Sequence, residues 1–230
     1  MPLKSISTKG VKIFRPAEWE LLLETVSPVR KVQLQGLLFT GMRYVEAVRF
    51  QQNPDWWDGR SYIALPEGAA KKEKAEFSQR TIKLSKLGSD TLPLFLKEEN
   101  RLPDRNTWDW IIKDACEKAG IEFRGPRTKK IAEERIITRT PDGKIAKDPE
   151  TKKRMIQRVG ERLIPAWSVN AKSTRKTWES WLAMVYGGNN LQLIQLYQGH
   201  NATTQSKHYL GLGFYPEDTE AMKKYVEGWL

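Results

Sequence analysis

The strongest constraint on the fold of this chain is an apolar pattern late in the sequence. Trp178, Trp181, Leu182 and Val185 follow one another at i, i+3, i+4 and i+7, the spacing that places side chains on one face of an α-helix. Because that face carries two tryptophans, we expect the helix to be buried against other elements. Further helical patterns cover Trp19–Leu23, Val32–Thr40, Met42–Val48, Asp90–Gly120 with a Pro-Asp turn near Pro103, Leu191–Gln198 and a C-terminal helix at about 217–230.

Short strands are predicted between the helical segments. Trp56-Trp57 and Ser61–Leu65 flank Asp58-Gly59, a hairpin signal, and Gln79–Leu84 has the composition of a third strand. The sequence therefore predicts an α+β fold that is mainly helical, with one small three-stranded antiparallel sheet. We expect a single domain over residues 1–230.

Two segments concentrate charge. The segment 67–78, between the second and third predicted strands, carries three lysines and is expected to be the turn of a basic β-hairpin. Residues 121–164 are dense in charge and contain Thr140-Pro141-Asp142-Gly143-Lys144, a turn signature. We expect a charged insertion at about 121–164, either a hairpin or a mobile loop.

The composition bounds the class of protein. A net charge of +11 over 230 residues points to a polyanionic partner. The single cysteine, Cys116, excludes an internal disulfide, and with only two histidines no metal site of the Cys/His kind is expected. The sequence contains no phosphate-binding or dinucleotide glycine motif, no secretory signal and no apolar run that would span a membrane. We expect an intracellular, cytoplasmic protein.

Cations crowd the start of the helix that carries the tryptophans. Lys172, Arg175 and Lys176 oppose the helix dipole there, at a cost of roughly 0.3–1 kcal/mol each. A bound anion resolves the conflict, because the free N–H groups and the cations can bind it together. A solvated basic turn is the alternative interpretation.

Arg43 is a second candidate for binding an anion. It follows a glycine and a methionine, and Glu46 lies three residues on, where it can hold the guanidinium. The two residues can also be a purely structural pair. Arg43 and Arg175 aimed at one site would suit a phosphate, because each offers a planar fork of donors.

A histidine and a tyrosine follow a helix end near the C-terminus. The pattern that begins at Leu191 stops at Gly199, His200 follows directly, and Tyr209 comes nine residues later. Each can equally be a capping or packing residue. Nine helical residues rise about 13 Å, so His200 and Tyr209 cannot meet across a straight helix.

Taken together, these segments resemble the catalytic domain of the tyrosine recombinase (phage-type integrase) family. The similarity of order and spacing runs from about residue 15 to 230, and the set of motifs is specific although each one alone is loose. The motifs are Thr40-Gly41-Met42-Arg43 with Glu46, the lysine-bearing hairpin, Lys172-Ser173-Thr174-Arg175, and Gly199-His200 with Tyr209.

One position departs from the family pattern. Lys172 stands where most members place histidine. In having lysine at this position, the chain resembles the integrases of archaeal viruses and plasmids, whose sequence around Arg175–Trp181 is also similar. A lysine with a pKa near 10.4 is a poor base unless that pKa is shifted. Lys172 is therefore expected to accept a proton at neutral pH only if its surroundings lower its pKa.

The resemblance implies a mechanism and roles for the residues. Tyr209 would attack a DNA phosphodiester and form a 3′-phosphotyrosyl intermediate, while Arg43 and Arg175 stabilise the transition state and Glu46 orients Arg43. Lys74 would protonate the leaving 5′-oxygen, with Lys72 and Lys71 as rivals. His200 would bind the phosphate, and Lys172 would bind it or move a proton. Tyr215 and Tyr197 are the next candidates for the nucleophile.

The resemblance also implies partners. The expected activity is site-specific DNA recombination (integration and excision) on a double-stranded attachment site, without metal or cofactor. We expect self-association to a tetramer on DNA, in which the C-terminal helix either packs on its own chain or docks into a neighbour. The N-terminal DNA-clamping domain of full-length relatives is expected to be absent. The alternatives are relaxation of DNA by a type IB topoisomerase and a non-catalytic DNA-binding relic.

Overall fold

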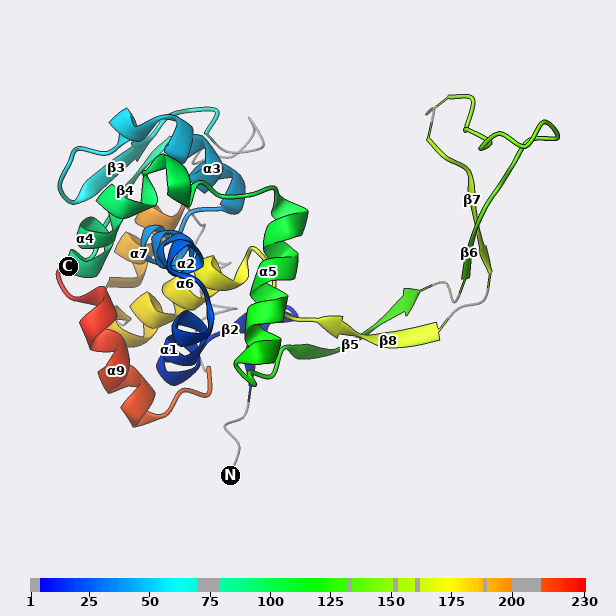
Figure 1. Ribbon diagram of the computed structural model, residues 1–230. Helices are drawn as coiled ribbons and strands as arrows, with labels where there is room; N and C mark the ends of the chain where they lie inside the picture. The colour runs from blue at the N-terminus through cyan, green and yellow to red at the C-terminus, as the bar shows by residue number, and fades with distance from the viewer. Residues whose placement is uncertain are drawn as a thin grey trace. The chain divides into compact units, whose positions relative to one another are not determined.

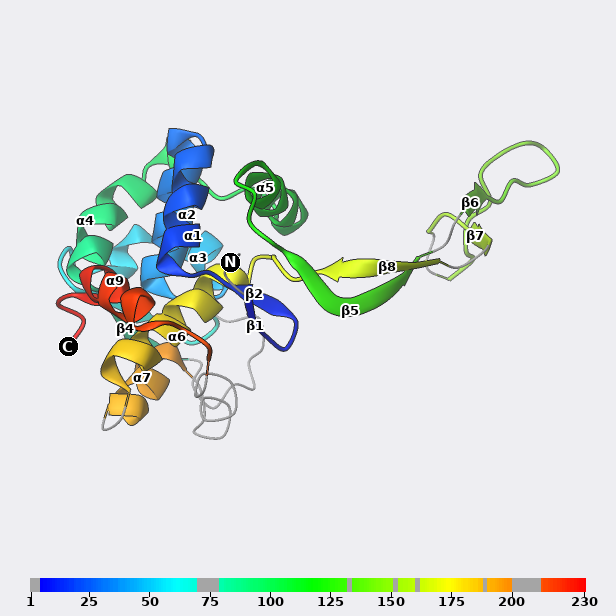
Figure 2. The ribbon, with the colours of Figure 1, turned by 90° about the horizontal axis from the view of Figure 1, so that it is seen from below.

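A computed structural model of the chain describes residues 5–69, 79–131, 134–150, 153–159, 162–187, 190–199 and 212–230. The chain divides into two units, one formed by Met1–Phe123 with Trp167–Leu230 and the other by Arg124–Ala166. Figures 1 and 2 show the helices in the first unit and a ribbon of strands in the second.

Helices dominate the first unit, and their starts follow from local sequence. Pro16, Pro28 and Pro216 each begin a helix, where the missing N–H of proline has no partner to lose. The prediction of a mainly helical fold is confirmed. The helices are α1 (Pro16–Thr25), α2 (Pro28–Thr40), α3 (Tyr44–Gln52), α4 (Lys86–Phe95), α5 (Arg105–Lys118), α6 (Ser173–Tyr186), α7 (Leu191–Gln198) and α9 (Pro216–Val226), with 3₁₀ turns η1 (Pro54–Trp56) and η2 (Glu98–Asn100).

Helix α6 lies in the core of this unit, as its apolar pattern predicts. Trp178, Trp181 and Leu182 are fully buried, and α6 packs against α2, α7, α9 and strand β2 (Val11–Ile13) (Figure 1). Trp178 meets Phe39 of α2 edge to face at 5.9 Å between ring centroids. The start of α6 is therefore fixed against the end of α2.

The predicted three-stranded sheet is wrong. Pro54 starts the 3₁₀ turn η1 instead of a strand, and Trp57 makes only an isolated antiparallel bridge to Ile63. What remains is a two-stranded antiparallel pair, β3 (Tyr62–Leu65) with β4 (Arg80–Lys83), in which Leu65 lies opposite Arg80. A second antiparallel pair joins β1 (Ile6–Thr8) to β2 in the leading segment, where no strands were expected.

Helix α9 packs on its own chain. Met222, Tyr225, Val226 and Trp229 are buried, and the helix contacts α1, α4 and α6. The Arg15 guanidinium, at the start of α1, forms a buried ion pair with Asp218 of α9. Among the described residues, no helix is both long and apolar enough to cross a bilayer.

The second unit, Arg124–Ala166, is called the ribbon below. Strand β5 (Arg124–Ile131) pairs with β8 (Arg162–Trp167), and β6 (Glu134–Ile137) pairs antiparallel with β7 (Ile156–Val159). Beyond β6 the chain turns at Thr140–Gly143, where the amide of Gly143 donates to the carbonyl of Thr140. The segment predicted as a hairpin or a loop thus contains paired strands.

Candidate active site

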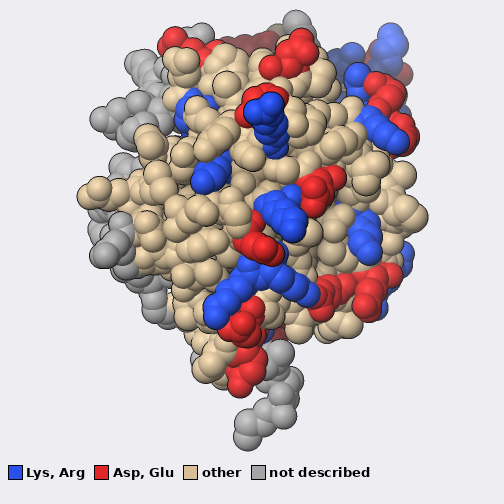
Figure 3. Space-filling view, turned by 90° about the vertical axis from the view of Figure 1, so that its left-hand side faces the viewer, with Lys and Arg blue, Asp and Glu red and all other residues tan. Residues whose placement is uncertain are grey.

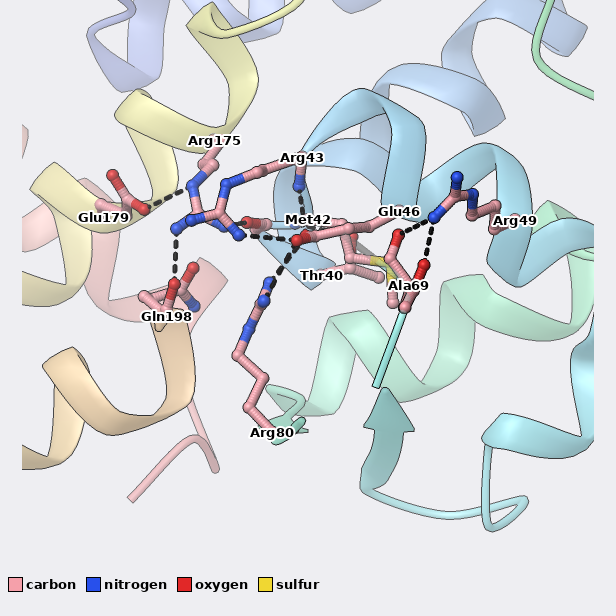
Figure 4. Close-up of polar contacts among 12 residues, drawn as sticks. Thr40, Met42, Arg43, Glu46, Arg49, Ala69, Arg80, Arg175, Glu179 and Gln198 are labelled. Carbon is pink, nitrogen blue, oxygen red and sulfur yellow. Dashed lines mark hydrogen bonds and ion pairs between the residues drawn. The ribbon is translucent and has the colours of Figure 1, made fainter. Parts of the chain in front are cut away.

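Glu46 is the centre of a cluster of arginines in the first unit (Figure 4). Its carboxylate accepts two hydrogen bonds from Arg80, at 3.1 Å to Oε1 and 2.7 Å to Oε2. Arg43 donates to the same carboxylate from Nη1 at 2.6 Å and from its backbone N–H at 2.8 Å. Glu46 therefore joins α3 to strand β4 and fixes the guanidinium of Arg43.

Local sequence explains how Glu46 reaches this position. Arg43 is the N-cap of α3 and Glu46 is the third residue of the helix, so its side chain turns back to the free N–H of the cap. The carboxylate is fully buried. Burial alone would raise its pKa, but the hydrogen bonds and charge of Arg80, with the charges of Arg175 and Arg43, outweigh burial and hold the pKa at about 2. Glu46 is therefore an anion at neutral pH.

Arg175 enters the cluster from the first turn of α6. Its Nη1 donates to the carbonyl of Gly41 at 2.7 Å, its Nη2 to the carbonyl of Gln198, and its Nε pairs with Glu179 at 2.7 Å. Burial lowers the pKa of Arg175 and the charge of Glu179 raises it, while an arginine stays protonated in proteins. This one side chain ties the end of α2 to the end of α7.

Two glycines permit this close approach. Gly41 ends α2 at φ +57°, and a Cβ there would lie 2.5 Å from Gln198 Oε1 and 2.6 Å from Trp178 Cδ1. Gly199 ends α7 at φ +63°, and its Cβ would lie 3.0 Å from Arg80 Cδ. Both positions need the left-handed backbone that glycine adopts without strain. The helix ends can meet the arginines only because these residues lack side chains.

The cluster holds more positive than negative charge. Three guanidiniums, of Arg43, Arg80 and Arg175, face two carboxylates, of Glu46 and Glu179. The side chains of Arg80 and Arg175 are buried, whereas that of Arg43 is 41% exposed. Arg43 is therefore the guanidinium of the three that an anion from solution can reach most directly.

The structure brings together three of the residues predicted from sequence, Arg43, Glu46 and Arg175. Lys172 caps α6 one turn before Arg175 and is exposed. Tyr215, an alternative nucleophile, caps α9 with its ring 4.6 Å from the Arg15 guanidinium. Tyr197 packs its ring on Trp229. The predicted residues Lys71, Lys72, Lys74, His200 and Tyr209 lie outside the described residues.

Residues on both sides of the predicted lysines form hydrogen bonds with side chains of α3. Ala69, at its start, accepts a hydrogen bond of 2.9 Å from Arg49 of α3. Arg80, at its end, binds Glu46 of the same helix. In addition, Gly199, which precedes His200 in sequence, lies against Arg80. Arg80 and Gly199, which flank the segments that carry the lysines and His200 in sequence, thus lie at the arginine cluster, and Figure 4 shows Arg80 there.

Arg80 was missed by the sequence reasoning, although a signal for it exists. In β4, Arg80 and Ile82 are buried while Thr81 between them is exposed. Strand side chains alternate between two faces, so Arg80 shares the inward face with Ile82. A charged residue on a predicted inward face is unusual unless it is paired, and that is the condition found here.

Comparisons with known proteins give one distant similarity. No protein-family model and no curated protein matches the chain. Among solved structures, the chain is similar to the crystal structure of XerA recombinase, with a TM-score of 0.49 and 16% sequence identity; the match covers 92% of this chain and 64% of that one. The chain thus spans about two thirds of the length of that protein.

Proposed function

We propose that this chain is a DNA breaking and rejoining enzyme of the tyrosine recombinase kind, which performs site-specific recombination through a 3′-phosphotyrosyl intermediate. One observation carries the proposal. Arg43 and Arg175, which lie far apart in the sequence, converge around the ends of α2 and α7 with Arg43 open to solvent. Two guanidiniums held in this way suit the non-bridging oxygens of a single phosphate.

The arginines would act on the transition state. Attack on phosphorus builds negative charge on the non-bridging oxygens, and fixed cations stabilise that charge without having to reorganise. Arg43 would contact the phosphate with its exposed guanidinium. Arg175 would add its charge beside the phosphate, held in place by the carbonyls of Gly41 and Gln198 and by Glu179.

Each proposed chemical step exchanges one phosphodiester bond for another. The Tyr209 oxygen would attack phosphorus as the bond from phosphorus to the 5′-oxygen breaks, so that one phosphodiester is exchanged for another. The phenol proton leaves to a base, and the 5′-oxygen takes a proton from a hairpin lysine, Lys74 with Lys72 and Lys71 as rivals. Attack by a 5′-hydroxyl on the phosphotyrosine reverses the step and rejoins the strand.

The remaining predicted residues complete the site in this proposal. His200 would donate a hydrogen bond to the phosphate, and Lys172 would bind the phosphate or assist in moving a proton. Arg80 joins them as a positioning residue, because it shares the carboxylate that holds Arg43. The positive charge that stabilises the transition state would come from the arginines and lysines of the protein itself.

The partners follow from the same proposal. The substrate would be a double-stranded attachment site inside the cell, on which protomers assemble as a tetramer. In this structure α9 packs on its own chain through Met222, Tyr225 and Val226. Exchange of α9 between protomers would therefore require those contacts, and the Arg15–Asp218 pair, to break first.

A covalent adduct tests the proposal. Duplexes that bind the full chain are selected from a random-sequence pool, labelled, nicked near the centre of the selected site and incubated with the chain. On a denaturing gel we expect a protein–DNA adduct that is lost in Tyr209→Phe and kept in Tyr215→Phe. Arg43→Ala should reduce the rate of adduct formation by more than about tenfold, since one charged hydrogen bond to a transition state is worth several kcal/mol.

Each other outcome decides against part of the proposal. An adduct that persists in Tyr209→Phe and disappears in Tyr215→Phe or Tyr197→Phe would move the nucleophile. Relaxation of any supercoiled plasmid without sequence preference would make the chain a topoisomerase. Selected DNA that binds tightly and never forms an adduct would leave a non-catalytic DNA-binding protein.

A further inference from the structure

The ribbon concentrates the positive charge of the chain. Residues 124–166 contain 13 Lys and Arg against 6 Asp and Glu, a net charge of +7, which leaves +4 for the other 187 residues. On the face of the first unit shown in Figure 3, Lys and Arg are interspersed with Asp and Glu. A surface with one dominant sign of charge, as on the ribbon, fits a polyanion.

Cations also lie opposite one another near the turn of the ribbon. An isolated antiparallel bridge places Lys147 opposite Arg154, and the backbone register of β6 and β7 pairs position 135 with position 158, both of them arginines in the sequence. Like charges directly opposite each other in a sheet are destabilising. A ligand that brings its own negative charges removes that repulsion.

The cations near the turn are open to solvent. Lys147, Lys153 and Arg154 are exposed, and the side chain of Lys144 is 84% exposed although it pairs with Asp142 at 3.1 Å. An exposed lysine or arginine can bind a phosphate and release the counterion condensed on the nucleic acid.

The paired strands and the composition of the ribbon indicate which kind of nucleic acid it would bind. The segment 124–166 contains no Phe, Trp or Tyr, so it lacks the aromatic platforms on which single-stranded bases stack. A two-stranded β-ribbon fits the major groove of B-form DNA, whereas the major groove of an RNA duplex is too narrow for side chains to read.

We propose that the ribbon is an arm that binds duplex DNA, with its paired strands against the groove and its cations on the phosphates. This inference rests on the proposed function for the identity of the partner. It adds a DNA-binding surface formed by residues of the second unit to the one proposed around Glu46 in the first.

Measuring the noncovalent affinity for DNA tests whether the ribbon is a DNA-binding arm. The full chain, Lys147→Glu/Arg154→Glu, and the control Lys31→Glu/Lys97→Glu are titrated onto a labelled DNA duplex between about 50 and 200 mM salt. Lys31 and Lys97 are exposed residues of the first unit, and both variants change the net charge equally. We expect the ribbon variant to bind at least about tenfold more weakly and its log–log salt slope to fall by about 2, since each phosphate contact contributes about 0.9. The control should bind like the wild type.

Several results would overturn the proposal. They are an unchanged salt slope in the ribbon variant, an equal loss in the control, and binding of an RNA duplex, single-stranded DNA or anionic vesicles as tightly as duplex DNA. If the double glutamate variant is misfolded by circular dichroism, Lys147→Gln/Arg154→Gln replaces it, with an expected fall in slope of the same sign. The assay needs no strand cleavage, so a chain that forms no adduct yet shows ribbon-dependent affinity would refute the proposed enzyme and not the arm.

Discussion

Replacing Glu46 by glutamine tests whether the arginine cluster depends on a buried negative charge. The side chain is fully buried, and glutamine keeps its shape while removing the charge that Arg80 and Arg43 share. The pKa of Glu46 falls from 4.5 to about 2, and one pKa unit corresponds to about 1.4 kcal/mol. We therefore expect Glu46→Gln to lower the free energy of unfolding at pH 7 by about 3 kcal/mol.

The pH dependence of this stability difference shows whether the lost charge causes it. Because the pKa of Glu46 is lower in the folded than in the unfolded chain, its stabilising contribution is complete above the unfolded value of 4.5 and is lost as the pH falls toward 2. The difference between wild type and Glu46→Gln should shrink by about 1 kcal/mol at pH 4 and by about 2 kcal/mol at pH 3. Only below the folded pKa of about 2 is Glu46 mostly protonated, and the neutral acid and glutamine should then behave alike.

Urea denaturation from pH 7 to pH 3 measures this difference. Glu98→Gln is a matched control, because Glu98 forms an exposed ion pair with Arg101 and such pairs contribute only about 0–1 kcal/mol. A Glu46→Gln variant as stable as Glu98→Gln at pH 7 would refute the reasoning. So would a difference from wild type that stays constant down to pH 3, since this would indicate lost packing instead of lost charge.

Two further predictions concern the surroundings of the cluster. Gly41→Ala should destabilise the fold by more than about 2 kcal/mol, because it adds a left-handed alanine and a contact of 2.5 Å with Gln198. Gly59→Ala, at φ +74° with open space around it, should cost only the backbone strain, and equal losses in urea denaturation would contradict the contact. The Cys116 thiol is buried, and burial raises its pKa to about 12. It should not react with a thiol reagent at pH 8 until urea unfolds the chain, and fast labelling of the native protein would show that the site opens.

The helices of the first unit could be predicted because their signals are local. A proline at the first turn, a serine cap at Ser27 and apolar residues at helical spacing act within one or two turns of the chain. The buried face of α6 is the clearest case, with Trp178 and Trp181 fully buried as the pattern requires. Such signals do not depend on which partner element covers the helix.

The sheets were harder to predict because pairing is decided by residues far apart in sequence. Trp56-Trp57 has the aromatic content of a strand, yet the preceding Pro54 favours a 3₁₀ turn and leaves only one bridge, at Trp57. The pair β1–β2 was not foreseen, because its strands are three residues each. Part of their stability comes from elsewhere, as Lys12 of β2 donates its backbone N–H to the carbonyl of Ser168.

For the candidate site, sequence could suggest the residue types and not the way in which they are shared. Arg43 and Glu46 are three residues apart, so their ion pair is a local feature. That Arg80 also binds Glu46 depends on the register of β3 with β4 and on the packing of β4 against α7. The role of Gly41 likewise depends on Gln198, which reaches it from another helix.

The contribution of Arg80 follows from counting charges. If Glu46 paired with Arg43 alone, the carboxylate would cancel the charge of the guanidinium that is most exposed to solution. Because Arg80 binds both oxygens of that carboxylate, and Glu179 pairs with Arg175, these five side chains, counted among the described residues, together carry one positive charge. In the proposed function, Glu46 would then hold Arg43 in position without neutralising the proposed phosphate site. Arg80, which is buried, would thus set the affinity of the exposed Arg43 for an anion.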